Sequence, residues 1–279
     1  MIRIEEHLQG EGFQKLFRAR DVSSQAQLLV AFDVRSSRVD IRAFQHAVAY
    51  ESPGVFPFAF VGKLDFREGI DISESSETWV LAERATEGAW LPSLLGRFDT
   101  DALADPESRR LPSYDPKTAV PNALALGRSA GRILVTAAER GRRLTRVRPE
   151  YMWARDLDGC LEVTGLSARA DAFFAMTRVD AVREPLFDRH YYAPEEHLKD
   201  ADDRAITFAL AIIIAEWATG RFPYKRKFHS SGPLSGKHLK LALPRRLEQL
   251  LSRGMALDRA KRPRLVELVQ ELEAIAKGT

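Results

Sequence analysis

The residues best suited to chemistry by type and spacing form a dense run of arginines. A guanidinium group stays charged at any working pH and offers several N–H donors, so such a run can bind phosphate or carboxylate groups. Basic residues near the end of a helix also have an ordinary role, because they complement the helix dipole. An anion- or partner-binding patch is therefore the weaker of two interpretations for this run, which consists of Arg140, Arg142, Arg143, Arg146 and Arg148.

Residues that bind metals or react with oxidants are scarce in the chain. Cys160 is the only cysteine, which excludes an intrachain disulfide and a cysteine-based metal site. The six histidines show none of the close spacings typical of metal ligands. The sequence therefore predicts no metal site and no resident cofactor.

Three stretches of the C-terminal half carry motifs in a fixed order. They are residues 191–196 (YYAPEE), the apolar run 209–215 that leads into 219–224 (TGRFPY), and residues 258–263 (DRAKRP). In order and spacing they resemble the A-P-E segment, the central buried helix and the D-P-x-x-R-P segment of the protein kinase C-lobe. The resemblance implies a two-lobed α+β fold over residues 1–279, with a small β-rich N-lobe at 1–83 and a larger α-helical C-lobe at 84–279.

The positions that would perform phosphoryl transfer in this family hold unsuitable residues here. The Pro149-Glu150 pair sets the register and places Arg146 at the position of the catalytic base. An arginine cannot accept a proton from a substrate hydroxyl. The two Mg²⁺-ligand positions fall on Tyr151 and Gly165, and neither supplies the carboxylate or amide oxygen that Mg²⁺ prefers.

The N-terminal segment is similar to a nucleotide-binding N-lobe that has lost its phosphate contacts. Gly10 and Gly12 begin a glycine-rich stretch, but Gln14 stands where a third glycine would let the backbone approach a phosphate. Ala31 keeps the position of an adenine-facing residue. The resemblance thus implies a vestigial nucleotide site, and weak nucleoside binding stays open.

The charge pair that orients phosphates in the family is also missing from the matching positions. Asp33 replaces the lysine of the third strand, which puts a negative charge where phosphate needs a positive one. The partner glutamate would fall near Ala43. Arg42 lies close enough in sequence for a reversed pair with Asp33.

Framework residues of the family are retained. Glu195 and Arg262 match the buried ion pair that ties the activation segment to the C-lobe. The aspartate usual in the central helix aligns instead with Ile206, and Asp202 and Asp203 precede it by about one turn. Leu144 and Leu166 replace a histidine and a phenylalanine, and both are expected to pack in an apolar interior.

These losses predict a pseudokinase that acts through protein–protein interaction, as a signalling scaffold or an allosteric regulator of an active kinase. A divergent kinase-fold enzyme with weak nucleotide binding or other transferase chemistry is the alternative, with Glu150, Asp156 and Asp171 as its nearest acidic candidates. A weaker third interpretation is an anion or nucleic-acid binder that uses the arginine run. Its affinity would fall steeply with salt.

The elements that position these residues follow from periodicity. Strands are predicted at residues 27–34, 56–64 and 78–82, with a helix at 39–50 between the first two. An exposed connection at 96–122 precedes a helix at 123–140 that Gly141 terminates. Asp158-Gly159 favours a hairpin turn. Further helices are expected after Glu196 through Thr219, from Arg245, and at 264–276.

Composition limits the other function classes. The net charge of +3, from 42 basic and 39 acidic residues, is small for a nucleic-acid binder. The apolar run 205–219 contains Glu216 and is shorter than the ~20 residues that cross a bilayer. No secretory signal is apparent in the first residues. The expectation is a cytoplasmic protein with protein partners, without nucleic-acid binding or membrane insertion.

Overall fold

The structure is a computed structural model with mixed α and β architecture. It divides into two compact units, Met1–Thr86 with Ser167–Asp180, and Glu87–Leu166 with Ala181–Thr279. The lobe boundaries predicted from the resemblance stay a prediction. The residues that the structure describes are 2–9, 14–33, 52–56, 58–64, 78–84, 89–91, 115–142, 144–145, 147–157, 160–168, 191–195, 202–223 and 243–278.

A five-stranded antiparallel sheet forms most of the described part of the first unit. Its strands are ordered β1-β2-β3-β5-β4, with β1 (Ile2–Gln9), β2 (Gln14–Asp21), β3 (Gln27–Asp33), β4 (Phe58–Leu64) and β5 (Thr78–Arg84). The three predicted strands are confirmed as β3, β4 and β5, and β1 and β2 are additional. Ala19, Leu28 and Val30 are buried in this unit. The helix predicted at 39–50 lies outside the described residues.

A second, three-stranded sheet belongs to the second unit. It has the order β6-β7-β8, with β6 (Ala89–Trp90), β7 (Met152–Leu157) and β8 (Cys160–Leu166). Leu157 pairs with Cys160, so two residues connect β7 to β8. This register confirms the predicted hairpin, although Asp158 and Gly159 themselves lie outside the described residues.

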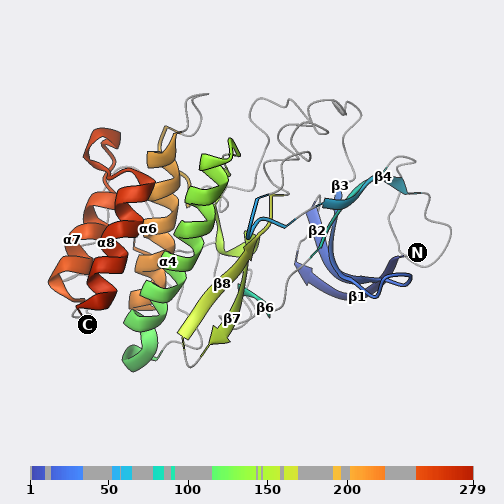
Figure 1. Cartoon of the computed structure of the whole chain (residues 1–279), viewed down its shortest axis with the longest axis horizontal. Coiled ribbons are helices and arrows are strands. Elements are labelled where there is room, and N and C mark those ends of the chain that lie inside the picture. Colours follow the sequence, from blue (N-terminus) through green and yellow to red (C-terminus); the bar gives the residue numbers. More distant parts are fainter. Residues whose placement is uncertain are drawn as a thin grey trace. The chain divides into compact units, whose positions relative to one another are not determined.

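Four α-helices of the described residues pack in the second unit and lie side by side in Figure 1. They are α4 (Pro116–Glu139), α6 (Asp203–Thr219), α7 (Arg245–Gly254) and α8 (Leu265–Lys277). Every residue of α6 from Ala205 to Thr219 is buried, as its continuous apolar run predicts. Helices α7 and α8 begin within one residue of the predicted positions. Helix α6, which Asp202 caps, lies within the helix predicted after Glu196 through Thr219, and residues 196–201 lie outside the described residues.

The start of α4 corrects one prediction. Residues 116–122 belong to the helix and not to an exposed connection. The Asp115 carboxylate accepts a hydrogen bond from the Lys117 N–H at 3.0 Å, and Pro116 occupies a first-turn position that needs no N–H donor. Pro121 sits inside the helix and removes one backbone hydrogen bond, so proline content alone misidentified this segment.

The end of α4 agrees with the sequence. Gly141 has a φ of +77°, which glycine adopts without strain. The Gly141 N–H donates to the Ala138 carbonyl at 3.0 Å, and the Arg142 N–H donates to the Ala137 carbonyl at 2.8 Å. These two bonds form a Schellman motif and fix where the chain leaves the helix.

The helices approach one another closely along α4. A Cβ atom on Gly131 would lie 2.5 Å from Val269 Cγ2, and one on Gly127 would lie 2.5 Å from Ile214 Cδ1. Glycine at these two positions therefore lets α8 and α6 pack directly against the α4 backbone.

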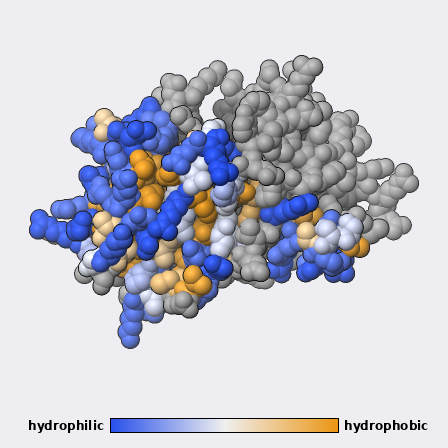
Figure 2. Space-filling model, in the orientation of Figure 1, coloured by the Kyte–Doolittle hydropathy of each residue, from blue (hydrophilic) through white to orange (hydrophobic). Residues whose placement is uncertain are grey.

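The surface of the described helices is largely hydrophilic, with hydrophobic residues between the polar ones (Figure 2). Within the part of the chain that the structure describes, each helix is too short or too polar to cross a membrane.

Candidate functional site

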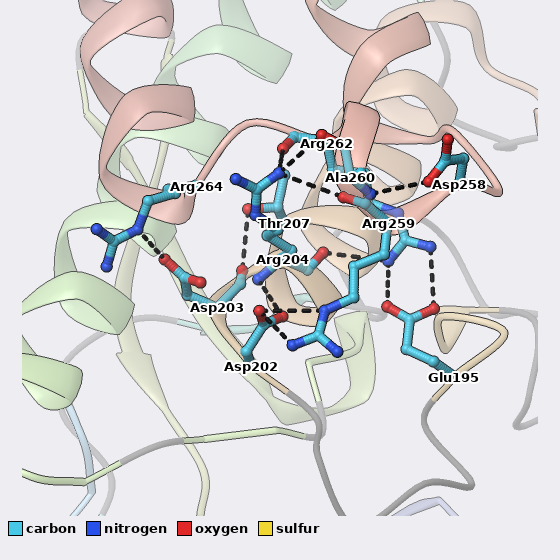
Figure 3. Close-up of polar contacts among 10 residues, drawn as sticks. All are labelled: Glu195, Asp202, Asp203, Arg204, Thr207, Asp258, Arg259, Ala260, Arg262 and Arg264. Carbon is cyan, nitrogen blue, oxygen red and sulfur yellow. Dashed lines mark hydrogen bonds and ion pairs between the residues drawn. The ribbon is translucent and has the colours of Figure 1, made fainter.

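A buried ion pair between Glu195 and Arg262 forms the centre of the polar cluster in Figure 3. One Arg262 NH group lies 2.5 Å from Glu195 Oε1 and the other lies 3.0 Å from Oε2, which makes a bidentate pair. The Arg262 side chain is 0% exposed and that of Glu195 is 13% exposed. Bidentate geometry of this kind suits arginine and is unavailable to lysine.

The remaining donors of Arg262 are satisfied by backbone groups. Its Nε–H donates to the Ala256 carbonyl at 2.6 Å, and an NH group donates to the Leu257 carbonyl at 3.1 Å. The guanidinium carbon lies 4.7 Å from the centre of the Phe208 ring, a cation–π arrangement. A charge buried this completely is tolerated because it is both paired and hydrogen-bonded.

Local structure on each side delivers the two partners. Arg262 follows the short 3-10 helix η3 (Arg259–Lys261), which the Asp258 carboxylate caps through the Ala260 N–H at 3.0 Å. Glu195 follows the buried Tyr191, whose hydroxyl donates to Glu216 Oε2 at 2.6 Å. The segment 191–195 is therefore held at both ends by side-chain hydrogen bonds. Tyr191 bonds to Glu216 of α6, and Glu195 bonds to Arg262, which follows η3.

Two aspartates at the start of α6 make the contacts that the sequence left open. Asp202 caps α6 by accepting from the Arg204 N–H at 2.9 Å, and its carboxylate lies 2.6 Å from an NH group of Arg259. Asp203 Oδ2 lies 3.1 Å from Arg264 Nε. Asp202 thus joins α6 to η3, and Asp203 joins α6 to Arg264 at the start of α8.

The environment of Asp202 favours its charged form. Partial burial alone would raise the pKa of this carboxyl group. The hydrogen bonds from the Arg259 side chain and the Arg204 N–H outweigh that burial and lower the pKa below its ordinary value.

Arg204 is a structural residue that sequence reasoning missed. Its guanidinium donates to the backbone carbonyls of Arg259, Ala260 and Arg262. The Arg259 carbonyl also accepts the Arg262 N–H at 3.2 Å, so Arg204 is a second donor there, and it supplies a donor to the carbonyls of Ala260 and Arg262 at the end of η3. Its one sequence signal is its position after two acidic residues at the start of a helix, and that pattern does not indicate a cap for another helix.

The positions predicted to have lost their catalytic groups fall in different elements. Tyr151 is buried in the 3-10 helix η1 (Pro149–Tyr151), and the Arg148 guanidinium carbon lies 5.3 Å from its ring centre. Gly165 is buried in β8 and pairs with Trp153 of β7. Arg146 lies outside the described residues.

The predicted nucleotide positions of the first unit are described only in part. Asp33 ends β3 in register with Gln14 of β2, and Ala31 pairs with Leu16. The other members, Gly10, Gly12, Arg42 and Ala43, lie outside the described residues.

The arginine run does not form one exposed patch. Arg140 is exposed, but Arg142 and Arg148 are buried. Arg142 closes the Schellman motif of α4 through its backbone N–H, and Arg148 lies over Tyr151. Arg143 and Arg146 lie outside the described residues. The patch was the weaker interpretation of this run, and Arg142 and Arg148 do not add to an exposed surface.

Other sequence expectations concern packing and the alternative acidic candidates. Leu144 and Leu166 are buried, which confirms that they pack in the interior. Asp156 is exposed on β7. Asp171 lies outside the described residues. Among the residues that the structure describes, no group of three or more histidine, cysteine, aspartate or glutamate side chains could hold a metal ion.

Two polar residues on α4, also missed from sequence, hold the edge of the second sheet. Ser129 Oγ accepts from the Val163 N–H at 2.8 Å, and Asn122 Oδ1 accepts from the Leu161 N–H at 3.2 Å. Both N–H groups belong to β8, which is one of the two edge strands of this sheet. Their only sequence signal was a polar residue beside the apolar face of a predicted helix.

Comparison with protein-family models found none that matches the chain, and comparison with curated proteins likewise found no match. Any proposal for function therefore depends on the residues described above.

Proposed function

We propose that the chain is a pseudokinase that acts through protein–protein interaction, as a scaffold or an allosteric regulator in signalling, and that it does not transfer phosphate from Mg·ATP. The main support is the buried Glu195–Arg262 pair, since both residues occupy the positions that the kinase resemblance assigns to a framework ion pair. Two further features are consistent with the proposal, a β-sheet unit at the start of the chain and a mainly helical unit after it.

The residues at the two Mg²⁺-ligand positions support the loss of catalysis. Gly165 has no side chain, and it lies buried within the β7–β8 ladder. Tyr151 is buried, and its phenol is neither a carboxylate nor an amide. Neither residue provides the hard anionic or amide oxygen with which a kinase holds Mg²⁺. Removing a general base in addition costs roughly 10²–10⁴ in rate.

The test is a thermal-shift titration of the full chain with ATP, with and without Mg²⁺, together with a phosphate-transfer assay using radiolabelled ATP. We expect no Mg²⁺-dependent stabilisation and no labelled product. A Mg²⁺-dependent rise of several degrees in the melting temperature would overturn the proposal and favour a kinase-fold enzyme. Glu195→Gln is the control variant in the same titration. It weakens the framework pair and leaves Tyr151 and Gly165 unchanged, so it shows how general destabilisation alone changes the melting temperature.

A further inference from the structure

The outer surfaces of α4 and α8 form one continuous face in the second unit. On α4 the contributing residues recur at i, i+3, i+7 and i+10, and on α8 they recur at i, i+4, i+7 and i+11, so each set shares one side of its helix. An ion pair between Arg132 and Glu273 joins the two sets. The α4–α8 face consists of Ala125, Arg128, Arg132, Val135, Val266, Gln270, Glu273 and Lys277.

The α4–α8 face carries more positive charge than its one carboxylate neutralises. Arg132 donates to Glu273 Oε1 from Nε at 2.8 Å and from an NH group at 2.6 Å. The hydrogen bond from Arg132 lowers the pKa of Glu273, and the charges of Arg132, Arg128 and Lys277 lower it further. Three cations thus act on one carboxylate, which leaves two positive charges unbalanced.

Arg128 acts on Glu273 through its charge, while the hydrogen bonds to that carboxylate come from Arg132. The Nε of Arg128 is buried and has no hydrogen-bond acceptor among the described residues. The other arginines of the helical unit that Figure 3 draws all reach a carboxylate or a backbone carbonyl. Arg128 and Lys277 both act by charge on Glu273, which Arg132 already pairs, so the positive charge left on this face is suited to an anion supplied from outside the chain.

An apolar contact lies on the same face. Val266 is 39% exposed, and it is one of three large hydrophobic residues of the described chain that are this exposed. Between residues 125 and 135 the α4 side of the face spans ~15 Å, or about three helical turns. A surface with cations at one end and an exposed valine on the same side suits an amphipathic partner.

We propose that the α4–α8 face binds an acidic, amphipathic segment of a partner protein. Carboxylates of the segment pair with Arg128 and Lys277, and its apolar side covers Val266. The inference rests on the proposed function, because it names the surface and the kind of partner through which a pseudokinase of this sequence would act.

The experiment uses a fluorescein-labelled amphipathic peptide of about three to four turns, with leucines on one side and glutamates on the other. Binding to the full chain is followed by fluorescence anisotropy. We expect the glutamate peptide to bind and its affinity to fall as salt rises. A matched peptide with lysine in place of glutamate is expected not to bind.

Variants locate the binding. Arg128→Gln is expected to weaken binding about tenfold, the effect of losing one charge-assisted hydrogen bond, and Lys277→Glu should weaken it at least as much, because it also adds a charge that repels the peptide. The matched control is Arg245→Gln, an exposed arginine on α7, which should leave affinity unchanged. Circular dichroism checks the fold, and the exposed Lys277 site carries the test should Arg128→Gln unfold the chain.

The inference is overturned if the glutamate peptide does not bind, if Arg128→Gln and Lys277→Glu bind it as the parent chain does, or if Arg245→Gln weakens it equally. Its failure is separable from failure of the proposed function. Loss of peptide binding with no response to Mg·ATP rejects the face alone, whereas phosphate transfer from Mg·ATP rejects the pseudokinase assignment whatever the peptide does.

Discussion

Arg262 and Glu195 are joined by two parallel hydrogen bonds across 67 residues of sequence, at 2.5 Å and 3.0 Å. The arginine is completely buried, so its charge depends on this carboxylate and on the carbonyls of Ala256 and Leu257. Water cannot replace a lost partner of a buried guanidinium group. Removal of Glu195 therefore leaves an uncompensated charge, and removal of Arg262 leaves an unfilled space.

Glu195→Ala is expected to lower the free energy of unfolding by ~3–5 kcal/mol, since it leaves Arg262 buried and unpaired. Arg262→Lys should also lower the free energy of unfolding, because one ammonium group cannot reach both carboxylate oxygens and both carbonyls. Urea unfolding followed by circular dichroism measures both effects. Arg253→Ala is the control, since it removes the exposed pair with Glu271 and should cost less than ~1 kcal/mol. Equal losses for the buried and the exposed pair would contradict the prediction.

Asp202 is expected to make stability depend on pH in the acid range. Its pKa is lower in the folded chain than the ordinary value of 3.8, so the unfolded chain takes up the proton first as the pH falls. The stabilisation is therefore complete well above pH 3.8 and is lost as the pH falls below that value through the folded pKa.

Asp202→Asn tests this dependence, because asparagine still caps the helix but cannot ionise. Urea midpoints measured between about pH 3 and pH 7 should show the variant less stable than the parent near neutrality, with a difference that shrinks as the pH falls below 3.8. Arg259→Gln should remove much of the same difference, since Arg259 donates the hydrogen bond that lowers the pKa. A gap between Asp202→Asn and the parent that stays constant with pH would refute the assignment.

Close packing between α4 and α8 predicts a rescue. Gly131→Ala places a Cβ 2.5 Å from Val269 Cγ2, and overpacking of this kind costs ~1–3 kcal/mol. Val269→Ala removes that methyl group, so the double variant should recover part of the loss despite the smaller core residue. Thermal or urea unfolding of the two single variants and the double variant measures the coupling. Strictly additive losses would show that the two residues do not meet as described.

The sequence predicted best those features that depend on residues close together in the chain. The continuous apolar run of α6, the glycine end of α4 and the two-residue hairpin at β7–β8 each depend on neighbours in the chain, and all three are confirmed. The start of α4 was missed because prolines usually indicate a loop. Here the Asp115 side chain caps the helix despite the prolines that follow it.

Features decided by distant partners were harder to predict. The bonds from Arg204 to the end of η3 join groups about 55 to 58 residues apart, and no local pattern announces them. Burial of Arg142 and Arg148 likewise depends on tertiary contacts, which the dense arginine run in the sequence does not indicate. Glu195 and Arg262 were found only because family motifs, and not periodicity, marked their positions.

The last prediction concerns the edge of the second sheet, where Ser129 Oγ accepts the Val163 N–H and also donates to the Ala125 carbonyl at 2.8 Å. Ser129→Ala leaves the Val163 N–H without this acceptor, which should cost ~1–3 kcal/mol. Amide hydrogen exchange by NMR should show faster exchange at Val163, with a smaller change at Leu161, whose acceptor is Asn122. Asn122→Ala should reverse that order, and because the two amides lie two residues apart on one strand, each variant is the other's control. Unchanged exchange at Val163 in Ser129→Ala would mean that the helix does not protect this edge.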